Sequence, residues 1–105
     1  ACSNSTRGIY FSGYSGSYTN VIEYIQIATT GNAVDFGDQL SNKAYGTAVS
    51  SPTRAVNMGG FDSPAATNVI EYVEISTLGN AVDFGDADSG TIQSAGGVSN
   101  GHGGL

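Results

Sequence analysis

At 105 residues the chain is sized for one small domain, and only 11% of its residues are charged. The formal net charge is −6, and Arg7, Lys43 and Arg54 are the only basic residues, which excludes the basic patch that nucleic-acid binding or an anionic membrane surface requires. No run of about 18 or more apolar residues is present, so we expect no membrane insertion. The many Gly, Ser, Thr and β-branched residues favour sheets and tight turns over a helical bundle.

The chain contains an internal repeat. Residues 20–38 return as residues 68–86 with fifteen of nineteen positions identical, at an offset of 48 residues. Such a period is typical of solenoids, propellers and other repeat arrays. We therefore predict a first repeat over 1–48, a second over 49–97, and the opening strand of a third over 98–105.

Two repeats alone rarely bury a continuous core, because each unit needs a neighbour on both sides. The chain also begins at Ala1 and ends within the repeat pattern. We therefore expect a processed or partial chain, whose partners are further repeats of the same protein or identical subunits.

Each unit is expected to form about four short strands. The strands of the first unit are expected at 8–14, 21–28, 33–36 and around 44–49, and the second unit repeats the first three at 55–61, 69–76 and 81–84. The first strand of each unit reads as ending at a glycine-rich bend covered by an aromatic ring, Tyr14 or Phe61. The Thr-x-Gly-Asn segments at 29–32 and 77–80 predict hairpin turns, and the short third strand is expected to end at a Gly-Asp pair.

The long strand, 21–28, is mostly apolar on both faces. Alternation places Val21, Glu23, Ile25 and Ile27 on one face and Ile22, Tyr24, Gln26 and Ala28 on the other. A strand of this kind is usually covered on both sides, so we expect a packing partner on each face.

The repeat resembles the kelch repeat of β-propellers. Each repeat begins with an arginine, Arg7 or Arg54, followed by a glycine-rich bend with an aromatic residue at 12–14 or 59–61. The strand Asn-Val-Ile-Glu-Tyr then supplies the first ring position, Tyr24 or Tyr72, and Phe36 or Phe84 stands at the second. Phenylalanine stands where the kelch pattern has tryptophan, so the repeat is a divergent subtype. The pattern NVIEYxxIxTxGNAVDFGD is also similar to tandem repeats in large virion-associated proteins of marine bacteriophages.

The resemblance implies two propeller blades that pack face to face within a larger propeller or repeat array. Glu23 and Glu71 would then lie at matching buried or half-buried sites, where a carboxylate needs donors. Arg7 and Arg54 are the expected partners, in one Arg–Glu or Arg–Asp pair per blade. If that pair is buried, Arg54→Leu should cost about 3–5 kcal/mol of stability.

The sequence contains no convincing catalytic, cofactor-binding or metal-binding residue. Asp-Phe-Gly at Asp35 and Asp83 matches a kinase tripeptide, but the other kinase segments are absent, and turn capping explains both aspartates. Asp83, Asp86 and Asp88 resemble a calcium loop without its closing glutamate, and whether they bind a cation stays open. His102, the only histidine, has no partner arrangement for catalysis and reads as part of a glycine-rich turn.

Aromatic residues gather early in the first unit. We expect Tyr10, Phe11 and Tyr14 to pack within the unit, whereas Tyr18 lies in an expected loop and is open to a binding role. Cys2, the only cysteine, is expected to be a small half-buried residue.

These observations predict an all-β, non-enzymatic structural or interaction repeat module of an extracellular or virion assembly, as a phage tail or fibre component. The alternative is a lectin-like module that binds a host-surface glycan or protein through Tyr18 and the loop 15–17. An enzyme is disfavoured, because a catalytic site needs unlike groups whereas a recent duplication supplies equal ones. A structural array, in contrast, reuses one good interface.

Overall fold

The computed structural model describes residues 1–11, 13–14, 16–61, 66–88 and 96. In this part of the chain the fold is all-β, as predicted, with eight strands in two four-stranded antiparallel sheets and no helix. The first sheet contains β1 (Cys2–Ser3), β2 (Arg7–Phe11), β3 (Thr19–Gln26) and β4 (Val34–Lys43). The second contains β5 (Thr47–Ser50), β6 (Arg54–Met58), β7 (Val69–Glu74) and β8 (Val82–Asp86).

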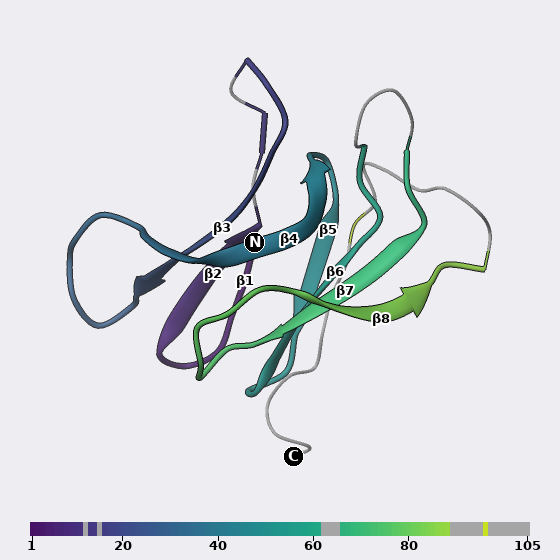
Figure 1. The fold of residues 1–105 in the computed structure, drawn as a ribbon. Helices are drawn as coiled ribbons and strands as arrows, with labels where there is room; N and C mark the ends of the chain where they lie inside the picture. Colours follow the sequence, from purple (N-terminus) through teal and green to yellow (C-terminus); the bar gives the residue numbers. More distant parts are fainter. Residues whose placement is uncertain (12, 15, 62–65, 89–95, 97–105) are drawn as a thin grey trace.

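Each sheet is a meander in which every strand pairs with the next one along the chain. Figure 1 shows the two meanders, purple to blue for the first sheet and teal to green for the second. The register repeats as well as the topology. Gly8 pairs with Ile25 in the first sheet, and Ala55 pairs with Val73 at the corresponding position of the second. The duplicated sequence therefore encodes two copies of one sheet.

The end of the first sheet differs from the sequence expectation. The third strand was expected to end near Gly37, but β4 continues through a bulge and reaches Lys43, which pairs with Thr19. The expected fourth strand around 44–49 is instead β5, which begins at Thr47 and opens the second sheet by pairing with β6. Tyr45, with a φ of 64°, lies in the turn between β4 and β5, which separates the two sheets.

The glycine-rich bend of the second repeat forms as predicted. β6 ends at Met58, and the next two residues, Gly59 and Gly60, have φ values of 68° and 115°. These left-handed conformations cost glycine little, because it has no Cβ. The bend brings Phe61 beside Ala44, and the two residues exchange backbone hydrogen bonds.

The core lies between the two sheets, where one face of the first sheet packs on the opposite face of the second. We call the face that carries the repeated phenylalanine the phenylalanine face, and the face that carries the first glutamate of the Asn-Val-Ile-Glu-Tyr strand the glutamate face. The phenylalanine face comprises Ile9, Ile22, Tyr24 and Phe36 in the first sheet and Val56, Ile70, Tyr72 and Phe84 in the second. The glutamate face comprises Gly8, Tyr10, Glu23, Ile25 and Ile27 in the first sheet and Ala55, Asn57, Glu71, Val73 and Ile75 in the second. The core forms where the phenylalanine face of the first sheet packs on the glutamate face of the second.

Each long strand is therefore covered on one face only, and the covered faces are opposite ones. In β3 the buried residue is Ile22, while Ile25 is 46% exposed; in β7 the buried residues are Glu71 and Val73. The expectation that strand 21–28 has a packing partner on each face is therefore wrong for the described residues, because the glutamate face of this segment is exposed at Ile25 and Ile27.

The two sheets approach each other closely at Gly37. A Cβ atom at Gly37 would collide with the backbone carbonyl of Gly79, whereas one at Gly85, the same position of the next repeat, meets no atom within 4 Å. We expect Gly37→Ala to destabilise the protein by about 1–3 kcal/mol more than Gly85→Ala, because overpacking forces the backbone apart.

Urea denaturation of the two variants at low protein concentration measures this difference. Gly85→Ala is a matched control because the φ values, 156° at Gly37 and 150° at Gly85, impose the same strain on alanine. Equal losses of stability in the two variants would contradict the close contact between the sheets.

Candidate functional site

A buried polar network lies in the interface between the sheets. Glu71, fully buried, forms an ion pair with Lys43, whose Nζ lies 2.8 Å from its Oε1. The other carboxylate oxygen accepts the backbone N–H of Leu40 at 2.9 Å. Asn57 donates to Gln39 Oε1 at 2.9 Å and lies 3.4 Å from Glu71 Oε1. Because an uncompensated charge is costly away from water, this network restricts how the first sheet can sit on the second.

Backbone hydrogen bonds also cross the interface. In the connection between β7 and β8, Gly79 N–H donates to Phe36 O at 3.0 Å, and Ala81 N–H donates to Asp38 O at 2.8 Å. The Asn80 side-chain oxygen accepts the N–H of Asp38 at 3.0 Å. The turn of the second repeat therefore pairs with the β4 backbone on both sides of Gly37, next to the buried Phe36.

The expected pairing of Arg54 with Glu71 is wrong. Glu71 takes Lys43 instead, because β4 runs on far enough to carry this lysine into the interface. Arg54 pairs with Glu74, with Nε 3.0 Å from Oε1, and both side chains are about half exposed, at 47% and 48%. A pair in that setting contributes little, so the large effect expected for Arg54→Leu does not apply.

Arg7 does bind across the interface, but to a carbonyl. Its Nη1 donates to Ile75 O of the second sheet at 2.7 Å, and its guanidinium carbon lies 4.8 Å from the centre of the Tyr24 ring. Arg54 stands 4.5 Å from the centre of the Tyr72 ring in the same way. The second arginine therefore has the pose of an interface residue.

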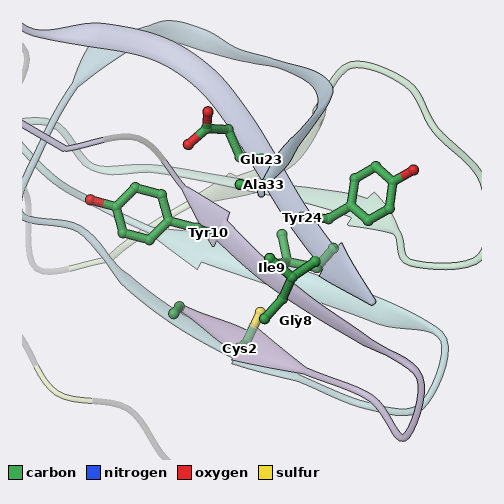
Figure 2. Close-up of a pocket in the computed structure, with 9 residues that line it drawn as sticks. Cys2, Gly8, Ile9, Tyr10, Glu23, Tyr24 and Ala33 are labelled. Carbon is green, nitrogen blue, oxygen red and sulfur yellow. The ribbon is translucent and has the colours of Figure 1, made fainter. Parts of the chain in front are cut away.

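An apolar pocket of about 250 Å³ opens on the glutamate face of the first sheet. Figure 2 shows it between β1, β2 and β3, with Glu23 and Ala33 above Gly8 and Cys2. Its lining residues are Ala1, Cys2, Gly8, Ile9, Tyr10, Glu23, Tyr24, Ile25 and Ala33.

This apolar pocket matches the part of the second sheet that receives Phe36. Gly8, Ile25 and Ala33 line the pocket, and their counterparts one repeat later are Ala55, Val73 and Ala81. Those three counterparts are buried in one cluster with Phe36. The pocket is thus the equivalent of an occupied position in the internal interface.

A second pocket, which we call the tyrosine pocket, has a volume of about 500 Å³ and lies nearby. Its lining residues are Tyr10, Gly13, Tyr14, Ser17, Thr19, Val21 and Glu23. Tyr10 and Tyr14 are both more than half exposed, which differs from the expectation that they pack within the unit; Phe11, in contrast, packs against the core. The tyrosine pocket is thus lined by aromatic rings, hydroxyl groups and the carboxylate of Glu23.

Tyr18 is held inside an aromatic cluster. Its ring centre lies 5.0 Å from that of Tyr14, 5.6 Å from that of Phe61 and 6.4 Å from that of Tyr45. Burial in this cluster raises the pKa of the Tyr18 hydroxyl, and the neighbouring Tyr45 and Tyr14 raise it further. The exposed rings of the cluster are Tyr14 and Tyr45, so these two offer more surface to a ligand than Tyr18.

The other candidates from the sequence do not converge. Asp83 Oδ1 accepts the backbone N–H of Gly85 at 3.1 Å, as expected for turn capping. Among the residues that the structure describes, no group of three or more potential metal ligands forms, and the Asp83, Asp86 and Asp88 set is not one. His102 lies outside the described residues. Cys2 is a half-buried free thiol, and burial raises the pKa of this thiol, which disfavours the reactive thiolate.

Sequence reasoning missed the polar network of the interface. Its members Gln39, Lys43 and Asn57 are not repeated, because the second repeat has Ala87 and Thr91 after its core segment and the first has Tyr10 in place of Asn57. The available signal was Lys43 itself, the only lysine of an acidic chain. A single lysine in a strand between two acidic repeats indicates a specific carboxylate partner.

A scan against protein-family models and a search of curated proteins find no match to this chain. Within the described residues, no helix is long and apolar enough to cross a membrane. The two sheets, their interface and their exposed faces are the features of this chain that bear on function.

The ion pair in the interface can be tested by substitution. We expect Lys43→Met to cost about 3–5 kcal/mol, because it leaves the Glu71 carboxylate buried without a cation. Adding Glu71→Gln removes that charge while retaining an acceptor for Leu40 N–H, and should restore most of the loss. Chemical denaturation of both variants measures the effect.

Arg54→Leu is the control for an exposed pair and should cost about 1 kcal/mol or less. A loss for Lys43→Met as small as that for Arg54→Leu would show that the Lys43–Glu71 pair is not buried in solution.

Proposed function

We propose that this chain is a non-enzymatic structural and interaction module, built from kelch-type blades, within an extracellular or virion assembly such as a phage tail or fibre. Its partners are further repeats of the same protein or identical subunits. Each four-stranded meander corresponds to one blade, and the packing of one sheet on the next corresponds to the contact between neighbouring blades.

One observation carries the proposal. The interface between the two described sheets joins the phenylalanine face of one repeat to the glutamate face of the next, and within the described residues one copy of each face is left exposed. A contact of this kind can be continued indefinitely, because every added unit covers one face and supplies another.

The uncovered faces are apolar enough to need a partner. Ile25, Ile27 and Tyr10 are about half exposed on the glutamate face of the first sheet, and Phe84 is 56% exposed on the phenylalanine face of the second. Contiguous apolar patches of this kind mark interaction surfaces. The virion setting is supported by the similarity of the repeat to tandem repeats of phage proteins.

A lectin-like role is the alternative, and the tyrosine pocket favours it. Exposed tyrosine rings beside hydroxyls and a carboxylate are groups that can stack on and hydrogen bond to a sugar. This pocket shares Tyr10 and Glu23 with the glutamate face, so glycan binding and packing of a further repeat would compete for one surface.

A tandem fusion tests the structural role. We expect a four-repeat chain, in which residues 2–105 follow directly after residue 97, to be more stable than the present chain. In a repeat array, stability rises with each added interface between neighbours. Thermal denaturation of both chains measures the gain.

The same fusion with Phe84→Asp in its first half is the matched control, because it spoils only the new junction. A fusion no more stable than this control, with the two halves melting as independent units, would contradict the repeat-array role.

Substitution in the tyrosine pocket tests the lectin alternative on an array of host-surface glycans. If this alternative holds, Tyr14→Ala and Ser17→Ala each abolish or strongly weaken any binding without changing the melting temperature. Tyr45→Ala is the control, because Tyr45 is as exposed as Tyr14 but does not line the tyrosine pocket. Equal effects of Tyr14→Ala and Tyr45→Ala would argue against this pocket.

A further inference from the structure

Phe84 has the same arrangement as an interface residue, yet its side chain is exposed in the part of the chain that the structure describes. The ring centres of Tyr72 and Phe84 lie 6.1 Å apart at an angle of 85°, nearly the same as the 5.9 Å and 82° of Tyr24 and Phe36. Phe36 is 2% exposed, whereas Phe84 is 56% exposed. The second sheet thus presents the same edge-to-face pair of rings that the first sheet buries.

The position that would receive Phe84 is open at the other end of the chain. The apolar pocket of about 250 Å³ is lined by Gly8, Ile25 and Ala33, the counterparts of the residues that pack around Phe36. Ile25 lies against Gly8, the counterpart of Ala55, and is half exposed, so it forms an accessible wall of the pocket against which an entering ring can pack.

We propose that a second copy of this chain binds head to tail, with Phe84 of one copy entering the apolar pocket of the next. This inference rests on the proposed function and names the partner of the two uncovered faces. A second copy fits these faces better than an unrelated protein does, because the chain already contains this interface once, between its own sheets.

The backbone groups needed for the contact lie in the corresponding places. In the internal interface, Gly79 and Ala81 donate to the carbonyls of Phe36 and Asp38. In the head-to-tail contact, Gly31 and Ala33 N–H of one copy would donate to Phe84 and Asp86 carbonyls of its neighbour. Figure 1 shows the β3–β4 connection that carries these donors projecting away from the second sheet.

The second sheet also has space for a neighbouring turn at Gly85 and a further hydrogen-bond donor in Arg54. No atom lies within 4 Å of a Cβ built at Gly85, so a neighbouring turn can approach there as Gly79 approaches Gly37. Arg54 already lies over the Tyr72 ring, and it would donate to the carbonyl of Ile27 in the next copy, as Arg7 does to Ile75.

One feature makes the contact between copies weaker than the internal one. Glu23 corresponds to Glu71, but the only lysine is Lys43, which is used by Glu71 within the chain. Arg7 and Arg54, the remaining bases, have the interface roles described above. A Glu23 carboxylate covered by a second copy therefore loses water without gaining a cation, and Glu23→Gln should strengthen the association.

The geometry of this contact is heterologous, since it joins two different faces. Repetition of such a contact gives a closed ring where the rotation closes and an open chain where it does not. Both products depend on the same two faces, so they can be tested together.

The experiment measures mass by analytical ultracentrifugation over a range of concentrations for the wild type, Ile25→Asp, Phe84→Asp, and an equimolar mixture of the two variants. We expect the wild type to assemble beyond a monomer as concentration rises. In each variant alone, one of the two faces needed for the contact is blocked. The concentration at which half of the protein is assembled, the midpoint, should therefore rise by roughly tenfold or more. The mixture retains one good pair of faces and should form a dimer and stop there.

Ile25→Ser and Phe84→Ser repeat the test with less disturbance, and circular dichroism shows whether each variant is folded. Glu23→Gln should shift the wild-type midpoint to lower concentration. A wild type that stays monomeric at every concentration overturns the proposal, as does a single variant that assembles like the wild type, or a variant mixture that forms no dimer.

These failures can be told apart from failure of the proposed function. A monomeric wild type together with a stabilised four-repeat fusion would overturn self-association while the repeat-array role stands. A fusion without added stability would remove the basis of both.

Discussion

The structure depends on one contact, the packing of the phenylalanine face of one repeat against the glutamate face of the next. Phe36 packs in one buried cluster with Ala55, Val73 and Ala81, and the β7–β8 turn donates backbone hydrogen bonds to the carbonyls of Phe36 and Asp38. A single four-stranded meander has two large faces and no core of its own, so the meander is stable only against a neighbour. The repeated sequence is the consequence, because one good interface can be used many times.

Polarity distinguishes the internal contact from the proposed contact between copies. Inside, Lys43 and Glu71 form a buried ion pair that Gln39 and Asn57 surround with hydrogen-bonding groups. Such a network adds little stability over an apolar core, but it strongly penalises any arrangement that separates the two charges. The outer faces have the apolar residues of the contact without this network. They are suited to reversible association, and the internal contact is suited to a permanent one.

Much of the fold could be predicted from the sequence because the duplication repeats its local signals. Alternating apolar residues, the turn at 77–80 and the Gly59–Gly60 bend each place an element correctly. The errors lie at the junction of the repeats, where no duplicate exists for comparison. There the strand expected at 44–49 is β5 of the second sheet, and β4 runs on to Lys43.

The sequence by itself determined that the chain is all-β and that it contains two nearly identical core segments. These properties follow from local periodicity and from the repeat, both of which are visible in one dimension. Only the tertiary structure decided which face meets which, because both faces of the long strand are apolar and alternation cannot rank them. It also decided that Glu71 pairs with Lys43 and not with Arg54, since that choice depends on how far β4 extends and on the depth at which each side chain lies.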